Sequence, residues 1–248
     1  MTNSLTIFSA EVIDDLIHFR RNKAISFDVL VKQVLFTGVQ ALGLCTLLSL
    51  VLGAIIIAEG YPLLTSIGQT EWIYKILIFA MVRDLGPFIV CLIILARSGT
   101  AICTELGNMR VNREIDALIC MGVAPISYLV TPRVIGMILS LVILMSYFLM
   151  TGIFGGFLIS NLFQNIPLVE FVTRLMDQLE ALDLFMMVLK VVMSGFFISV
   201  ISSFQGLSVQ RAITEVPQRN IKAVGGSVIA VVMVNAIGSG LYMILVNM

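Results

Sequence analysis

The sequence has few charged residues, a single histidine and no closely spaced pair of cysteines. Only 12% of its 248 residues are Asp, Glu, Lys or Arg, against roughly 25% in an average soluble domain. Hydrophobic residues make up 59%, which is more than a water-soluble fold of this size can bury. The composition therefore excludes a disordered chain and a water-soluble enzyme, and it indicates a membrane protein.

Several kinds of site are also missing from the sequence. Fifteen Lys and Arg residues balance fifteen Asp and Glu, so no excess of basic residues favours nucleic-acid binding. The four cysteines form no CxxC pair and no metal-ligand pattern with His18. There is no GxxxxGK, GxSxG or HExxH motif. We expect no catalysis, metal or cofactor on this chain, so uphill transport would need an ion gradient or another subunit.

Five apolar segments are long enough to cross a bilayer, which takes roughly 20 residues. The sequence predicts spans at about 34–58, 76–96, 134–158, 184–206 and 223–248. We therefore expect an all-α polytopic membrane protein in which residues 1–248 form a single domain. An odd number of spans would place the two chain termini on opposite sides of the membrane.

The cations are unevenly distributed among the segments that connect these spans. Eleven of the fifteen lie before the first span, between the second and third, or between the fourth and fifth: Arg20, Arg21, Lys23, Lys32, Arg97, Arg110, Arg113, Arg133, Arg211, Arg219 and Lys222. The opposite loops hold only Lys75 and Arg174. Because cytoplasmic loops carry the excess of Lys and Arg, the N-terminus is predicted to be cytoplasmic and the C-terminus external.

Residues 1–32 precede the first span and contain an amphipathic pattern. Five apolar residues recur at intervals of three and four and so share one helical face: Leu5, Phe8, Val12, Leu16 and Phe19. Such a pattern is typical of a helix that lies in the membrane interface. We predict an interfacial amphipathic helix within residues 1–32.

Two adjacent charges, Arg83 and Asp84, interrupt the second span. A charge at membrane depth costs at least ~2.5–3.5 kcal/mol on insertion scales, so it usually faces a cavity or a partner. Pro87 removes the donor that the Arg83 carbonyl would have used, and Gly86 weakens the same turn. We predict a polar cavity at this turn, with a structural ion pair between helices as the alternative. Lys190, in the fourth span, is interpreted as reaching to the interface, with pairing to Asp84 as the alternative.

A cytoplasmic loop, residues 97–133, contains a short helical pattern. Ile115, Leu118, Ile119 and Gly122 recur at helical spacing, and Gly122 can end the helix. Long loops tend to be functional, so this segment is predicted to dock a soluble partner.

In that prediction, the apolar side chains of Ile115 and Leu118 are the buried anchors. Glu114 and Asp116 are polar contacts or acids favoured by the helix dipole.

Over residues 83–133 the sequence resembles the MlaE (YrbE) family, the permeases of lipid-transporting ABC systems associated with MCE proteins. The resemblance rests on six segments: Arg83-Asp84-Leu85-Gly86-Pro87, Ala96-Arg97-Ser98-Gly99, Glu105-Leu106-Gly107-Asn108-Met109, Glu114-Ile115-Asp116-Ala117-Leu118, Met121-Gly122-Val123-Ala124-Pro125 and Pro132-Arg133.

This resemblance implies a homodimeric phospholipid permease in the bacterial inner membrane, driven by two copies of a cytoplasmic ABC ATPase. It also implies an external MCE-domain protein and allows for a small STAS-like cytoplasmic subunit. Arg83, Asp84 and Pro87 would belong to the lipid cavity. The residues implied in ATPase coupling are Glu105, Glu114, Ile115, Asp116, Leu118 and Gly122.

Two segments depart from the family pattern and make the chain a divergent member. Residues 211–217 follow Phe204-Gln205-Gly206 where relatives have a glycine-rich stretch, and Asn235 stands where relatives carry an acid. Two other functions stay open. An ATP-independent transporter or channel would rely on Arg83, Asp84 and Lys190 for coupling, whereas a non-transporting scaffold would have no use for them.

Overall fold

The computed structural model describes residues 2–17, 34–35, 37–70, 72–164, 167–210 and 212–246. Every regular element within these ranges is a helix. Five helical segments of the described chain are long and apolar enough to cross a membrane: Val39–Ser66, Trp72–Val111, Ile126–Leu162, Ala181–Leu207 and Glu215–Val246. The prediction of an all-α polytopic membrane protein with five spans is therefore confirmed.

The helical elements of the described chain form these five spans and three shorter helices outside them. The first contains η2 (Val39–Ala41) and α3 (Leu42–Ser66); the second contains α4 (Trp72–Ile78), η3 (Phe79–Asp84), α5 (Leu85–Ile94), η4 (Leu95–Gly99) and α6 (Thr100–Val111). The third contains η5 (Ile126–Val130) and α8 (Thr131–Gln164), and the last two are α10 (Ala181–Leu207) and α11 (Glu215–Val246). The short helices are α1 (Thr2–Ile17), α7 (Glu114–Cys120) and α9 (Leu168–Met176).

Several helices extend beyond the apolar segments that predicted them. The first span continues past Glu59 to Ser66, and the second continues through residues 97–111, which were expected to be loop. The third begins at Ile126, eight residues before its expected start at 134. Hydropathy marks only the part of a helix that suits lipid, whereas its backbone hydrogen bonds continue through polar residues in water.

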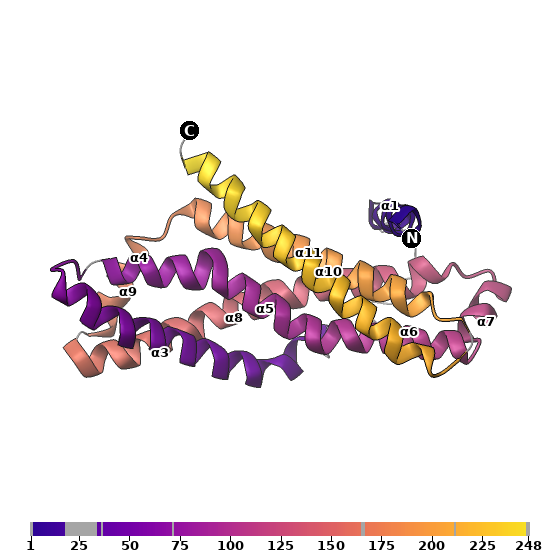
Figure 1. Ribbon diagram of the computed structural model, residues 1–248, viewed down its shortest axis with the longest axis horizontal. Helices are drawn as coiled ribbons and strands as arrows, with labels where there is room; N and C mark the ends of the chain where they lie inside the picture. Colours follow the sequence, from indigo (N-terminus) through magenta and orange to yellow (C-terminus); the bar gives the residue numbers. More distant parts are fainter. Residues whose placement is uncertain are drawn as a thin grey trace.

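The spans run together along the long axis of the molecule, as Figure 1 shows. At one end lie α7 and the turn between α10 and α11. At the other lie the turn between α3 and α4, and the short helix α9. The helix α11 crosses the bundle obliquely, and the marks for the two termini lie toward opposite ends. The loops that the cation count groups on one side therefore lie at one end of the structure.

The helix α1 lies across the bundle: Figure 1 shows it end-on, whereas the spans run horizontally. Its predicted apolar face is present, but it packs on the protein rather than on lipid. Phe8, Val12 and Leu16 contact a cluster that includes Val130 and Val200. Asp15 fixes the same face by accepting hydrogen bonds from Ser127 and Thr131, each 2.6 Å long.

A second apolar face of α1 is exposed instead. Ile7, Ile13 and Ile17 are the large apolar side chains on it. These residues, rather than the predicted face, are the ones available to lipid. Phe19 and the rest of residues 18–32 lie outside the described part of the chain.

The longest helix contact, between α3 and α8, depends on small residues. A Cβ atom on Gly53 would collide with the carbonyl oxygen of Gly152, and Gly156 lies at the same contact. Hydroxyl groups pair across it, between Thr46 and Tyr147 at 2.7 Å. The GxxxG spacing in the third span therefore lets two backbones approach closely and places α3 beside α8.

Candidate functional site

The second span has a wide, π-helical turn at η3, directly before Pro87. The N–H of Leu85 donates to the carbonyl of Ala80, five residues back, and Asp84 has a non-helical backbone with φ −128° and ψ −67°. A Cβ atom on Gly86 would collide with the carbonyl oxygen of Met81, so this turn requires glycine. π-helical turns of this kind occur often at functional sites.

Lys190 of α10 points into this turn. Its Nζ donates to the carbonyl of Arg83 at 2.6 Å, to Oδ1 of Asp84 at 2.8 Å and to Oγ of Ser239 at 2.8 Å. The side chain is only 3% exposed. The interpretation that Lys190 reaches to the interface is therefore wrong, and the alternative of pairing with Asp84 is correct. The reason is that Pro87 leaves the Arg83 carbonyl in need of a donor, which the lysine supplies.

Arg83 makes a second ion pair, at the N-terminal end of α10. Its Nη2 donates to Oδ2 of Asp183 at 3.2 Å, and its Nε lies 2.8 Å from Oδ1 without hydrogen-bond alignment. Oδ2 of Asp183 also accepts the N–H of Glu180 at 3.2 Å as part of the α10 capping box. The guanidinium lies over the Tyr242 ring, 4.5 Å from its centre. Arg83 thus joins the second span to the start of α10 and the end of α11.

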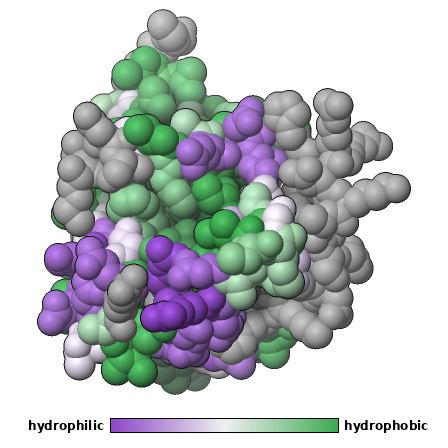
Figure 2. All heavy atoms as spheres, turned by 90° about the vertical axis from the view of Figure 1, so that its right-hand side faces the viewer, coloured by the Kyte–Doolittle hydropathy of each residue, from purple (hydrophilic) through white to green (hydrophobic). Residues whose placement is uncertain are grey.

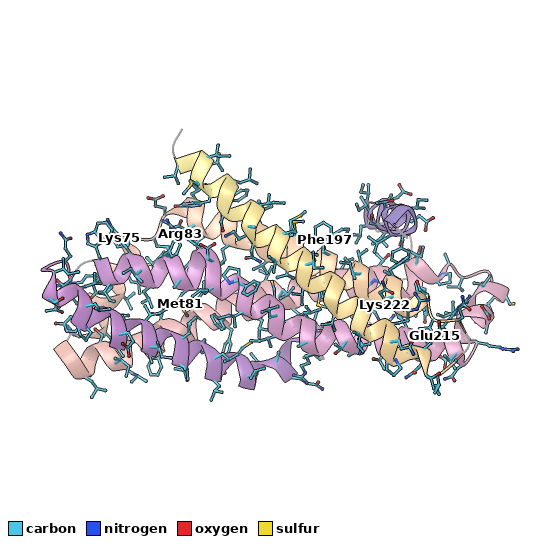
Figure 3. All side chains as sticks on the ribbon, viewed as in Figure 1. Lys75, Met81, Arg83, Phe197, Glu215 and Lys222 are labelled. Atoms are coloured by element: carbon cyan, nitrogen blue, oxygen red, sulfur yellow. The ribbon has the colours of Figure 1, made fainter. Side chains whose placement is uncertain are left out.

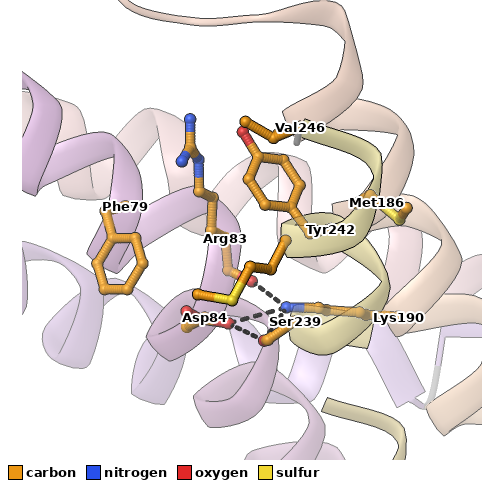
Figure 4. Close-up of a pocket in the computed structure, with 9 residues that line it drawn as sticks. Phe79, Arg83, Asp84, Met186, Lys190, Ser239, Tyr242 and Val246 are labelled. Atoms are coloured by element: carbon orange, nitrogen blue, oxygen red, sulfur yellow. Dashed lines mark hydrogen bonds and ion pairs between the residues drawn. The ribbon is translucent and has the colours of Figure 1, made fainter. Parts of the chain in front are cut away.

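These groups border a cavity of about 440 Å³. Figure 4 shows Asp84, Lys190 and Ser239 gathered at one end of it, with Arg83 beside the Tyr242 ring. The lining residues are Phe79, Arg83, Asp84, Met186, Lys190, Ser239, Tyr242, Met243 and Val246. The two alternatives for the charged turn are therefore both present, since the charges pair between helices and also border a cavity. Apolar walls with a few converging polar groups are typical of ligand sites.

A second cavity, of about 490 Å³, continues from the first toward the α4 end. Phe79, Arg83, Tyr242 and Val246 line both of them. The second one adds polar residues at the rim, among them Lys75, Asp177, Gln178 and Glu180. Figure 3 places Lys75 and Arg83 toward this end of the bundle and Glu215 and Lys222 toward the other. The cavity therefore extends from the charged turn to the end of the molecule opposite α7.

Sequence reasoning assigned one residue to the cavity wrongly and missed others. Pro87 is buried and does not line either cavity, so it acts through the backbone. Asn235 donates to the carbonyl of its own helix at Val231 and also lies outside them. The missed residues are Ser239 and Tyr242, which line the cavity, and Asp183, which does not line it but pairs with Arg83. The spacing of three between Ser239 and Tyr242 places them on one face of the last span, which was the available signal.

The second predicted site, the helix α7, ends as its sequence predicts. Gly122 has a φ of 77°, its N–H donates to Ile119, and the N–H of Val123 donates to Leu118, each at 3.0 Å. This pair of bonds is a Schellman cap, which needs glycine in the left-handed conformation.

The predicted anchors of α7 face their own bundle. Ile115 is buried and Leu118 is half-buried against the core. They leave little surface for a partner, so the prediction that they anchor one is wrong. Ile119 is 55% exposed and Met121 69%, and these carry the apolar surface of α7. The periodicity fits both sides of such a short helix, so only the neighbours in space decide which side is covered.

Ion pairs tie α7 and its neighbours together. Arg110 donates to Asp116 at 2.6 Å, and Arg133 lies 2.9 Å from Glu105. Glu114 accepts from the Asn112 side chain at 3.3 Å. Figure 2 looks onto this end and shows hydrophilic side chains beside hydrophobic ones. Asp116 therefore holds α7 against α6, whereas Glu105 joins α6 to α8.

A five-span helical protein with a charged cavity at membrane depth has the architecture of a transport permease rather than of a catalytic enzyme. A family model described as Permease MlaE matches residues 30–241. The chain therefore belongs to the MlaE permease family.

Proteins similar to this chain include three from different organisms. A “Probable ABC transporter permease protein” of Rickettsia prowazekii is 28% identical over 207 residues, covering 84% of this chain and 80% of that protein. The chloroplastic protein TRIGALACTOSYLDIACYLGLYCEROL 1 of Arabidopsis thaliana is 28% identical over 211 residues, covering 85% and 60%. The “Intermembrane phospholipid transport system permease protein MlaE” of Haemophilus influenzae is 30% identical over 133 residues, covering 54% and 51%.

Removing Lys190 should destabilise the bundle more than removing its whole ion pair. Lys190→Leu leaves the Asp84 carboxylate and the Arg83 carbonyl unpaired, at a cost of about 3 kcal/mol, the lower end for buried pairs, because Asp84 is 32% exposed. The double variant Lys190→Leu with Asp84→Leu should recover part of this loss. Thermal unfolding of the purified protein in detergent measures the coupling, and strictly additive losses would show that the pair does not hold the turn.

Proposed function

We propose that the chain is the permease subunit of an ATP-driven phospholipid transporter and that the Arg83–Asp84 cavity holds the lipid. The observation that carries the proposal is the cavity itself, in which an ion-paired polar end meets apolar walls between helices that are long and apolar enough to span a membrane. Its volume suits a polar headgroup, while the open side leaves room for acyl chains. The name of the Haemophilus influenzae relative specifies phospholipid transport and supports the same proposal.

A second copy of the chain is the proposed partner within the membrane. The helix α11 supplies part of the cavity wall yet exposes a row of large apolar side chains: Ile229, Val232, Met233, Ile237 and Leu241. A homodimer would cover such a face, and symmetric pairs are the commonest assembly. The proposed site is the bacterial inner membrane, with the N-terminus cytoplasmic and an MCE-domain protein on the external face.

The energy would come from a cytoplasmic ABC ATPase that carries the ATP and Mg, with a STAS-like subunit as a further partner. The name of the Rickettsia prowazekii relative specifies an ABC transporter and supports this assignment. We propose that α7 contacts the ATPase through Ile119 and Met121. Asp116 would act by holding α7 through its ion pair with Arg110, and Glu105 by joining α6 to α8 through its ion pair with Arg133.

Ion-coupled transport without ATP is less well supported. It would need a charged group in the membrane that can gain or lose its ion during the cycle. Arg83 and Lys190, the cations bordering the cavity, are each paired with a carboxylate of another helix. Such pairs favour a fixed framework over a titrating one.

Filling the cavity should remove bound lipid without unfolding the protein. Met243 lines the cavity and is exposed, so Met243→Trp adds bulk there without disturbing the core. We expect phospholipid retained in mild detergent to fall about tenfold, with unchanged thermal stability. The matched control Met150→Trp changes an equally exposed methionine on α8 and should retain lipid. Mass spectrometry of the purified protein measures the retained phospholipid. An undiminished amount in Met243→Trp would contradict the proposed site.

The orientation can be tested with single cysteines. Cys45, Cys91 and Cys103 are buried, so Cys120→Ser removes the exposed thiol among the described residues. In that background Ser66→Cys should react with a membrane-impermeant maleimide in intact cells, because it is the exposed last residue of α3 at the proposed external end. Asn112→Cys and Thr214→Cys should react only after the membrane is permeabilised. Reaction of Asn112→Cys in intact cells would reverse the orientation.

A charge on the exposed face of α7 should release the ATPase. Ile119→Asp places a carboxylate at the proposed contact, and we expect ATPase recovery on the tagged permease to fall at least about fivefold, as for a hot-spot residue. Ile67→Asp makes the same change at an equally exposed position of the opposite end. It should leave recovery unchanged. Full recovery with Ile119→Asp would show that α7 is not the contact.

A further inference from the structure

The charged groups at the cavity differ in the hydrogen bonds that they can still make. Lys190 uses all three N–H bonds of its ammonium on Arg83, Asp84 and Ser239. It is almost fully buried, so it has nothing left to offer a ligand. Lys190 therefore positions its neighbours and does not bind.

Asp84 keeps one carboxylate oxygen available. Its Oδ1 accepts from both Lys190 and Ser239, whereas no hydrogen bond within the described part of the chain engages Oδ2. The side chain is 32% exposed and lines the cavity. A carboxylate oxygen of this kind can accept a hydrogen bond from a ligand ammonium.

Arg83 likewise keeps part of its guanidinium available. One N–H of Nη2 donates to Asp183 and Nε faces the same carboxylate without hydrogen-bond alignment, which leaves both N–H bonds of Nη1 and the second one of Nη2. The side chain is 27% exposed to the cavity. Figure 4 shows the guanidinium at one end of the cavity and the Asp84 carboxylate toward the other. One cavity therefore presents a donor for a phosphate and an acceptor for a cation.

The charge balance of the cavity disfavours a net anion. Arg83 and Lys190 are matched by Asp84 and Asp183, so this set of four is neutral. At the rim, one cation, Lys75, stands beside two carboxylates, Asp177 and Glu180. An anionic headgroup would bring an uncompensated negative charge into a low-dielectric site, whereas a zwitterion would bring none. A second copy of the chain would add the same neutral set.

We infer that the cavity selects zwitterionic phospholipid headgroups, with the phosphate on Arg83 and the amine cation on Asp84. The inference rests on the proposed function, because it requires that the cavity holds phospholipid. The Phe79 ring, which lines the same cavity, can face a quaternary ammonium as well as a primary one. Phosphatidylcholine should therefore bind as phosphatidylethanolamine does, and phosphatidylglycerol should not.

The experiment offers the full-length protein a choice of lipids. The detergent-purified chain is exchanged into nanodiscs that contain phosphatidylethanolamine, phosphatidylcholine and phosphatidylglycerol in equal amounts. Native mass spectrometry then counts the lipids of each kind that stay bound when the protein is released from the nanodiscs. We expect each zwitterionic lipid to exceed phosphatidylglycerol at least about fivefold. Equal retention, or an excess of phosphatidylglycerol, overturns the headgroup inference alone, whereas no retained lipid overturns the proposed function as well.

A variant tests the role of Asp84. Asp84→Asn removes the negative charge but keeps an oxygen for Lys190 and Ser239, so the preference should fall to near equality while lipid still binds. Glu170→Gln neutralises an exposed carboxylate on α9, outside both cavities, and should keep the preference. An unchanged preference in Asp84→Asn would overturn the inference.

A change of lipid tests the same point without altering the protein. N-acyl phosphatidylethanolamine keeps the phosphate but lacks the ammonium, so the wild-type chain should retain it as poorly as phosphatidylglycerol. Retention equal to that of phosphatidylethanolamine would show that Asp84 does not read the amine, even where Asp84→Asn fails to fold.

Discussion

The ammonium group of Lys190 holds the membrane-embedded site together. It reaches from α10 to a backbone carbonyl and a carboxylate of the second span and to a hydroxyl of α11. Without it, the turn before Pro87 would leave the Arg83 carbonyl without a donor and the Asp84 carboxylate with only the Ser239 hydroxyl, where water is scarce. Three helices are thereby fixed around one point, and the cavity is the space that remains beside them. The wide turn at η3 therefore depends on the hydrogen bonds that Lys190 donates to it.

The second ion pair has a different consequence. Arg83 contacts Asp183 in the first turn of α10 and stacks on Tyr242 of α11, so it fixes the N-terminal end of α10 and the C-terminal end of α11. Buried pairs contribute little net stability, since desolvation offsets most of their attraction. Their effect here is geometric: they hold the polar groups of the cavity in set positions while keeping its net charge at zero. A neutral framework suits the binding of a ligand better than the movement of a proton.

Local anomalies in the sequence predicted much of this arrangement, and long-range partners account for what it missed. The five spans and the Gly122 cap follow from composition and spacing within short segments. Arg83 and Asp84 stood out because charges are rare in an apolar run. Asp183 looks like one more acid of an outer loop, and Ser239 like any small residue of a span, until the fold brings them to the turn. The direction of Lys190 and the covered side of α7 depend on neighbours distant in sequence, which no periodicity encodes.

The second span links the two candidate sites without an intervening loop. From Trp72 to Val111 it is one 40-residue helical segment, which carries Arg83 and Asp84 near one end and Glu105 and Arg110 near the other. The last two residues pair with Arg133 and with Asp116 of α7. One π-helical turn, η3, contains Arg83 and Asp84, and a second, η4, lies between them and Glu105; such turns are where a long helix bends most readily. A force on α7 therefore acts on the same backbone that shapes the cavity, and the turn at Asp84 is where that backbone is least regular.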